Sequence, residues 1–293
     1  MTALLSGRHD RLHSQAVLRA LLSPLALALL GLCLCAAPAQ AQEASYVQHD
    51  YMKVPSDQAQ AYLNLEQDVW KPIHRERAED GTIEAWNLYE VVFPAGAERT
   101  HDFVTATFYD SWDRMEAPYE ESHLTNAHPD MSAEQLSQRT VQARSLVRSE
   151  VVEVMATVTG EETESEGEHY VVVDYMKVPE GGGADYVEGE QELWRPIHQE
   201  LIERTSQTAW HVVQLQFAGA EAPYQYMSIR PFEDWSYLNP SAEANSFQSA
   251  FPAAFKAAHP DRSPEEMIED TNESRTIHRR EVWRLVDSVE PSN

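Results

Sequence analysis

A stripe of polar and aromatic side chains occurs twice in the sequence at helical spacing. Each series holds a tyrosine, a glutamate, a tryptophan and a histidine four residues apart: Tyr62, Glu66, Trp70 and His74, then Tyr186, Glu190, Trp194 and His198. Four steps of about 100° advance the helix by only about 40°, so each series lies along one slowly turning stripe that overlaps the apolar face. We therefore expect both glutamates among buried side chains, where a carboxyl needs a partner or takes a proton.

Three roles are open for these two acids. Each could accept hydrogen bonds from Lys53 or Lys177, from a tyrosine or from a tryptophan and tie helix to strand. Each could instead be a general base of raised pKa facing a cavity, with His74 or His198 as a relay. In the third alternative the helix is rotated and both acids are solvated. The catalytic candidates are thus the two glutamates and two histidines of the stripe, joined by Asp50 and Asp174, because aspartate is disfavoured within strands: Glu66, His74, Glu190, His198, Asp50 and Asp174. Alternation leaves open which sheet face carries the two aspartates.

The same stripe argues against a metal site. Glutamate and histidine stand eight residues apart in each copy, a rise of over about 10 Å, so one helix cannot bring both to a single ion. The only cysteines, Cys33 and Cys35, lie near the amino terminus and form no CxxCH sequence. We expect no metal.

The amino terminus predicts export. A basic start precedes an apolar run over residues 21–37 and the small residues Ala39-Gln40-Ala41. This pattern is typical of a secretory signal peptide, which we place at residues 1–41, and it predicts a periplasmic or extracellular protein. The run contains Pro24 and is shorter than the ~20 residues of a membrane span, so none is expected after cleavage.

The charge excludes one class of partner. The chain has 48 acidic and 22 basic residues, a formal net charge of -26. Such a surface repels phosphate backbones, so nucleic acid is not an expected partner.

An internal repeat divides the remaining chain into two copies. Residues 50–74 and 174–198 are identical at 13 of 25 positions, including YMKVP at both Tyr51 and Tyr175. The stretch 159–168, TGEETESEGE, has no large apolar side chain and reads as a solvated linker. We predict one domain over 42–158, an acidic linker over 159–168 and a second domain over 169–293.

Each copy shows the same order of hydrophobic periods. A strand-like segment ends at Pro55 or Pro179, and helical spacing follows over 61–77 and 185–203. Two strands come next, at 85–93 and 102–109 and at 209–217 and 224–232. Capping boxes at Ser132 and Ser263 announce a second helix, and a last strand covers 143–154 and 275–286. The order β-α-β-β-α-β, twice, predicts an α+β protein of two ferredoxin-like domains.

This duplicated order resembles the dimeric α/β barrel superfamily, which includes the antibiotic-biosynthesis monooxygenases and the chlorite dismutases. The resemblance covers residues 45–290 and implies that the two sheets close into one intramolecular, pseudo-dimeric barrel. It rests on element order and duplication, and no catalytic motif of the family is matched, so it assigns no catalytic residue. Chlorite dismutases raise haem as an alternative, whereas the residues themselves lead us to expect no cofactor.

Alternation along the second and third strands separates two sets of side chains. The more apolar set, with Val91, Val104, Val213 and Met227, is expected under the helices. The tryptophan-containing set is then expected to line the barrel interior and to bind the ligand: Trp86, Glu90, Thr105, Thr107, Trp210, Gln214, Ser228 and Arg230.

The sequence therefore predicts an exported protein that holds a small apolar or aromatic molecule in a pocket between two fused barrel halves. A cofactor-independent, monooxygenase-like enzyme acting on an aromatic substrate is one alternative. A structural pseudo-dimer without a ligand is another. The sequence does not decide between a monomer and a homodimer.

Overall fold

The computed structural model describes residues 45–96, 99–116, 120–160, 169–219, 221–242 and 245–290. The predicted signal peptide and residues 161–168 of the predicted linker lie outside this part of the chain. The two repeat copies share one compact unit. Within the described ranges no helix is long and apolar enough to cross a membrane.

Both halves contain the predicted element order. The first half consists of β1 (Tyr46–Lys53), α1 (Ala59–Leu65), the π-helical η1 (Glu66–Trp70), α2 (Lys71–Glu79), β2 (Ala85–Phe93), β3 (Phe103–Tyr109), α3 (Trp112–Met115), α4 (Glu121–Ala127), α5 (Ala133–Ala143) and β4 (Ser145–Thr159). The second half consists of β5 (Tyr170–Lys177), α6 (Gly183–Gly189), the π-helical η2 (Glu190–Trp194), α7 (Arg195–Arg204), β6 (Ala209–Leu215), β7 (Tyr226–Phe232), the 3-10 helix η3 (Trp235–Leu238), α8 (Phe247–Ala258), α9 (Pro264–Ser274) and β8 (Thr276–Val289).

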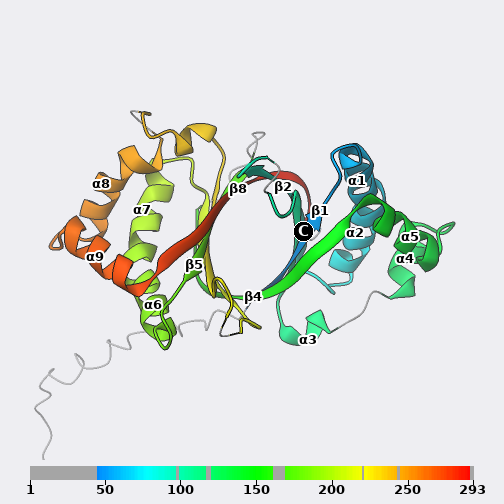
Figure 1. The fold of residues 1–293 in the computed structure, drawn as a ribbon, viewed down its shortest axis with the longest axis horizontal. Helices are drawn as coiled ribbons and strands as arrows, with labels where there is room; N and C mark the ends of the chain where they lie inside the picture. Colours follow the sequence, from blue (N-terminus) through cyan, green and yellow to red (C-terminus); the bar gives the residue numbers. More distant parts are fainter. Residues whose placement is uncertain are drawn as a thin grey trace, which may run out of the picture. The chain divides into compact units, whose positions relative to one another are not determined.

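The strands close into one antiparallel barrel in the order β1-β3-β2-β8-β5-β7-β6-β4 (Figure 1). Each half contributes four neighbouring strands, and the halves meet at two seams, β2 with β8 and β4 with β6. The prediction of an α+β fold with two ferredoxin-like halves in an intramolecular barrel is confirmed.

The length of the last strand of each half explains the closure. β4 has 15 residues and β8 has 14, whereas the other strands have seven to nine. The first part of β4 pairs with β1 of its own half, and its later part, from Val152 to Thr159, pairs with β6 of the other half. β8 does the same with β5 and then β2. Each long strand thus belongs to both sheets.

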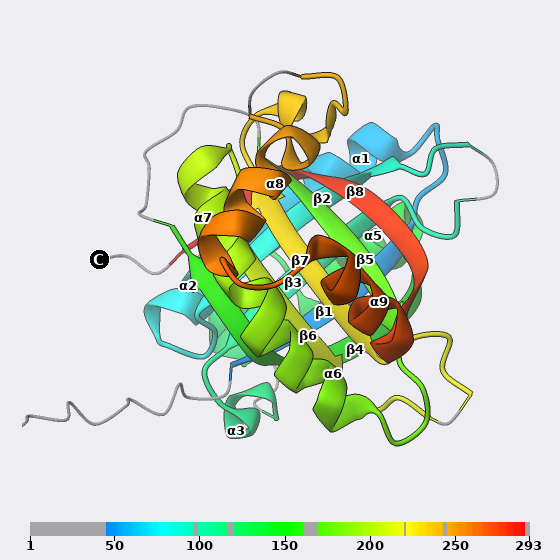
Figure 2. The ribbon, with the colours of Figure 1, turned by 90° about the vertical axis from the view of Figure 1, so that its left-hand side faces the viewer.

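The helices lie outside the barrel. α1, α2, α4 and α5 cover the first half, and α6 to α9 cover the second (Figure 1). Figure 2 shows α6, α7, α8 and α9 in front of the second sheet. The predicted caps are present, since the Gln135 amide donates to Ser132 Oγ at 3.2 Å and the Glu266 amide donates to Ser263 Oγ at 3.1 Å.

Both first helices contain a π-helical turn just before a proline. In η1 the Lys71 amide donates to the Glu66 carbonyl, five residues back, and η2 repeats this with Arg195 and Glu190. Pro72 and Pro196 follow immediately and cannot donate a backbone hydrogen bond. The wider turn accommodates the proline within a helix that would otherwise be interrupted.

The second half contains a helix that the repeat did not predict. α8 lies in the insertion between Trp235 and His259 and packs against α7 and α9. Its buried side chains Ala254 and Phe255 join Ile197, Leu201 and Met267 in one apolar cluster. The first half has only the shorter α4 at the corresponding place.

Two aromatic groups join the halves outside the barrel. Trp112 contacts Tyr46 of its own half, with ring centroids 5.3 Å apart, and Phe217 of the other half at 5.8 Å. At the equivalent place Trp235 contacts Tyr170 at 4.8 Å and Phe93 of the other half at 6.1 Å. The repeated tryptophan and phenylalanine thus connect the two copies.

We expect the Trp112 and Phe217 rings to be energetically coupled, by about 0.5–1.5 kcal/mol. Urea unfolding of Trp112→Ala, Phe217→Ala and the double variant gives this coupling. Combining Trp112→Ala with Phe93→Ala, from the other aromatic group, is the control and should be additive within about 0.5 kcal/mol. Additive behaviour of the Trp112 and Phe217 variants would contradict the contact.

Candidate functional site

The tryptophan-containing set faces the helices, so the predicted face is wrong. The Trp86 ring stacks on His74 of α2 at 4.8 Å, and the Trp210 ring stacks on His198 of α7 at 5.0 Å. The other members of the set lie on the same face of the sheet, either further along the strand of each tryptophan or on the strand paired with it. They are Glu90, Thr105, Thr107, Gln214, Ser228 and Arg230. The apolar set, with Val91, Val104, Val213 and Met227, forms the cluster inside the barrel instead.

The closed barrel explains this reversal. Its interior is enclosed by strands on every side, so apolar side chains of the two sheets pack there against one another. The helix-covered face supplies hydrogen-bond partners, as when Trp210 Nε1 donates to Ser228 Oγ at 3.1 Å. The polar members of the tryptophan-containing set therefore find hydrogen-bond partners on that face.

The candidate histidines are packing residues of the helix face. His74 and His198 are 4% and 2% exposed, and each contacts two tryptophans, one on its own helix and one on the sheet. Burial is the main reason that the pKa of both imidazoles lies well below its usual value. Neutral, aromatic-packed imidazoles connect helix to sheet in both halves.

The candidate glutamates are buried on the same face and lie beside arginines. Glu190 accepts from Arg275 Nε at 3.0 Å. Glu66 lies beside Arg144 and Tyr62, and burial raises its carboxyl pKa to about 7 although Arg144 opposes the shift. Both acids are buried, as predicted. They lie beside arginines, which were not among the predicted partners, and beside the tyrosines of the stripe, which were. Lys53 instead bonds Asp102 at 3.3 Å.

The two strand aspartates also lie on the helix face, opposite Thr105 and Ser228 in the strand register. Asp174 is 2% exposed and accepts from Arg230 Nη2 at 2.6 Å and Arg280 Nη2 at 2.8 Å. Burial alone would raise the pKa of Asp174, but the two guanidinium groups hold it below its usual value. Asp50 is half-buried and accepts from Gln48 at 3.1 Å.

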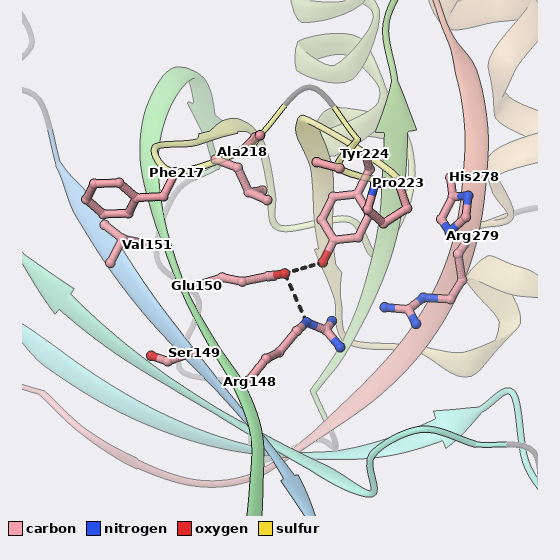
Figure 3. A pocket seen from close by; sticks show the side chains of 13 residues that line it. Arg148, Ser149, Glu150, Val151, Phe217, Ala218, Pro223, Tyr224, His278 and Arg279 are labelled. Carbon is pink, nitrogen blue, oxygen red and sulfur yellow. Dashed lines mark hydrogen bonds and ion pairs between the residues drawn. The ribbon is translucent and has the colours of Figure 1, made fainter.

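A different group of residues surrounds a pocket of about 380 Å³ at one end of the barrel (Figure 3). β4 of the first half contributes Arg148 and Glu150. The second half contributes Tyr224 from the segment after β6, and His278 and Arg279 from β8. The pocket therefore exists only where the two halves meet.

Two arginines from equivalent positions dominate this pocket. The guanidinium carbon of Arg148 lies 3.6 Å from the centre of the Tyr51 ring, and that of Arg279 lies 4.3 Å from the centre of the Tyr175 ring. These tyrosines are the first residues of the two YMKVP repeats. Figure 3 shows both guanidinium groups pointing into the same space. In each, Nη2 is buried and has no hydrogen-bond acceptor among the described residues.

Each arginine is paired with a glutamate two residues further along its strand. Arg148 Nε donates to Glu150 Oε1 at 2.9 Å, and Arg279 Nε lies 3.3 Å from Glu281 Oε1. Each glutamate is also bound by the opposite half. Tyr224 donates to Glu150 at 2.5 Å, and His101 Nε2 lies 3.3 Å from Glu281.

Glu281 is the more deeply buried of the two glutamates. It is 2% exposed and accepts from Tyr175 Oη at 2.8 Å and Trp283 Nε1 at 2.9 Å. Burial alone would raise the pKa of its carboxyl, but His101, Arg279 and Trp283 together hold it below its usual value. His49, buried in the same interior, has its pKa lowered to about 4 mainly by burial. The interior thus contains a fixed carboxylate and a neutral imidazole.

The last strand of each copy also contains a sequence pattern for this site, outside the strands whose alternation predicted the ligand-binding residues. The sequences RSE at 148–150 and RRE at 279–281 place an arginine and a glutamate at the same alternation in both last strands. Charged side chains two apart in a strand share one face. Because the last strands turned out to close the barrel, that shared face points into its interior.

Haem does not fit the candidate histidines. A haem iron needs an axial side chain at the wall of a cavity. His74 and His198 do not line the pocket at the barrel end, and both are nearly fully buried against tryptophans. Among the described residues no group of three or more potential metal ligands occurs.

Comparison with known proteins supports the fold alone. No family model and no curated protein matches the sequence. A putative monooxygenase from Fusobacterium nucleatum matches with a TM-score of 0.51 at 12% identity, over 85% of this chain and 95% of that one. A putative monooxygenase from Lactobacillus acidophilus matches with a TM-score of 0.46 at 10% identity, over 85% and 97%. A mutant chlorite dismutase from Candidatus Nitrospira defluvii matches with a TM-score of 0.46 at 7% identity, over 83% and 91%. The chain shares the fold of the Fusobacterium nucleatum structure, an α/β barrel with tandem halves.

Glu66→Gln should stabilise the protein increasingly as the pH rises from about 4.5 to about 7. The pKa of Glu66 is higher in the folded protein than in the unfolded chain, so its stabilising contribution is full below 4.5 and is lost as the pH passes about 7. The glutamine variant cannot ionise and avoids this loss, on the order of 3 kcal/mol. Urea unfolding at several pH values measures the difference, with the exposed Glu79→Gln as control. A difference independent of pH would contradict the raised pKa.

Glu281→Gln should lower the free energy of unfolding at pH 7 by about 3–5 kcal/mol, because it leaves buried donors facing an uncharged amide. The pKa of Glu281 is lower in the folded protein, so the contribution of the carboxylate is present above 4.5 and is lost as the pH falls further. The exposed Glu290→Gln should change stability by under about 0.5 kcal/mol. A loss below about 1 kcal/mol for Glu281→Gln would refute the buried network.

Proposed function

We propose that this protein binds a small molecule in the pocket between its two halves. The observation that carries the proposal is that Arg148 and Arg279, one from each half, line one cavity of about 380 Å³, and that the Nη2 donor of each has no acceptor among the described residues. Small-molecule sites are typically cavities of about 300–1,000 Å³ with a few convergent polar groups. Buried polar groups otherwise find partners within the protein.

The rest of the wall supports a ligand with an apolar part. Leu215, Phe217 and Pro223 line the cavity beside Tyr224, so one side of the pocket is apolar and aromatic. Arg148, Glu150 and Arg279 form a charged set in the same wall, and Tyr224 joins the apolar set to it through its hydrogen bond to Glu150 at 2.5 Å. This division supports a ligand that is partly apolar or aromatic, as the sequence suggested, but at a different site. With the signal-peptide pattern at residues 1–41, we propose that binding occurs outside the cytoplasm.

Native mass spectrometry of the protein recovered from the cells that make it tests this function. The wild type should retain a small molecule of defined mass. Ala218→Trp, which fills the pocket, should lose that molecule, whereas Ala253→Trp on the exposed side of α8 should retain it. A wild type without a bound molecule, or equal retention by both variants, would refute the pocket as the binding site and favour the structural pseudo-dimer.

A further inference from the structure

We infer that the ligand is an aryl monocarboxylate whose carboxylate is held between Arg148 and Arg279, one arginine from each half. This inference rests on the proposed binding function and specifies its ligand class.

The free donors define the recognised group. Each guanidinium carries five N–H donors in a planar fork, which matches the two oxygens of a carboxylate. Nε of each arginine already lies against a glutamate of its own strand, at 2.9 Å in Arg148 and 3.3 Å in Arg279. The Nη2 groups remain buried without an acceptor among the described residues. Both arginine side chains line the pocket and are about a quarter exposed, at 26% and 24%, so a ligand carboxylate there would supply acceptors to the two guanidinium groups.

The two glutamates do not remove the attraction for an anion. Glu281 is shared among Tyr175, Trp283, His101 and Arg279, and Glu150 is shared between Tyr224 and Arg148. Their charge is therefore distributed over other donors as well as the arginines. Two arginines and one glutamate line the pocket, so its charged side chains leave an excess of one positive charge. The protein as a whole has a net charge of -26, so anion binding has to come from this local group.

The asymmetry of the pocket wall indicates a ligand with one acidic group and not two. The arginines are related by the repeat, which alone would favour a symmetric diacid. The remaining wall is not symmetric, because Tyr224 stands where the first half has His101, and the second half supplies the apolar lining residues Leu215, Phe217 and Pro223. One end of the ligand is therefore acidic and the other is apolar, and Phe217 and Tyr224 favour an aromatic ring there.

Glu150 restricts where polar groups of the ligand can lie. Its Oε2 is buried and accepts no hydrogen bond among the described residues. A carboxylate placed next to this oxygen would be repelled, whereas a hydroxyl group on the aromatic ring could donate to it. We therefore expect the position of a ring hydroxyl to affect affinity.

Isothermal titration calorimetry with benzoate, its neutral counterpart benzamide, and inorganic phosphate tests the inference on the wild type. Benzoate should bind at least tenfold more tightly than benzamide or phosphate. One of the three hydroxybenzoate isomers should bind more tightly than benzoate. Equal binding of benzamide would show a site for neutral ligands, and equal binding of phosphate would show a site for inorganic anions. Either result would overturn the inference.

Variants then locate the carboxylate. Arg148→Gln and Arg279→Gln should each weaken benzoate binding at least tenfold, and the lysine variants should weaken it less. Arg195→Gln, which removes a charge from the exposed side of α7, should change the affinity by less than twofold. Circular dichroism confirms that each variant is folded, and Arg148→Lys and Arg279→Lys replace any glutamine variant that is not. Unchanged affinity in the folded Arg148 and Arg279 variants would overturn the inference.

The two proposals can fail separately. A retained neutral molecule in native mass spectrometry, with no preference for benzoate, would support the pocket and refute the carboxylate. Absence of a retained molecule together with no benzoate binding would refute both.

Discussion

The structure depends on the antiparallel pairing of each half's last strand with the other half. β4 leaves β1 to join β6, and β8 leaves β5 to join β2. The unpaired backbone groups at a sheet edge can pair with another chain, and a closed barrel has no such edge. Because both seams use strands that also belong to their own half, neither sheet can separate without losing pairing at both. Duplication on one chain supplies the partner that a single ferredoxin-like domain would have to recruit.

Closure also determines which side chains meet. It turns the arginine and glutamate of each last strand into the interior and places Glu150 against Tyr224 and Glu281 against His101, so each half binds the acid of the other. The helix-covered faces have a different chemistry. There Trp86 and Trp210 stack on His74 and His198, and the buried acids lie beside arginines. The most conspicuous repeated stripe in the sequence therefore packs helix against sheet, while the pocket uses Arg148, Glu150 and Arg279 from the two last strands.

Local patterns made much of the fold predictable. Helix caps, strand alternation and the repeat depend on neighbouring residues, and all of them are present as expected. Alternation divides β2, β3, β6 and β7 into two faces but does not say which face lies inside the barrel. The more apolar face was predicted to lie under the helices. That prediction was wrong because the barrel interior is more enclosed than the helix-covered face. The pocket was not predictable in this way, since Arg148 and Arg279 are 131 residues apart and meet only through the seam registers. α8 is longer than α4, which stands at the corresponding place in the first copy, so the repeat did not predict its length.

Amide hydrogen exchange at the seams tests the central claim most directly, because a pocket shared by two halves requires a barrel that stays closed. The Gln216 amide donates to the Val151 carbonyl across the seam between β4 and β6. The account predicts that this amide, and the β4 amides facing β6, exchange only through global unfolding, as slowly as amides between β5 and β7. Faster exchange along the two seams than within each half would show that the halves separate, and would contradict the account.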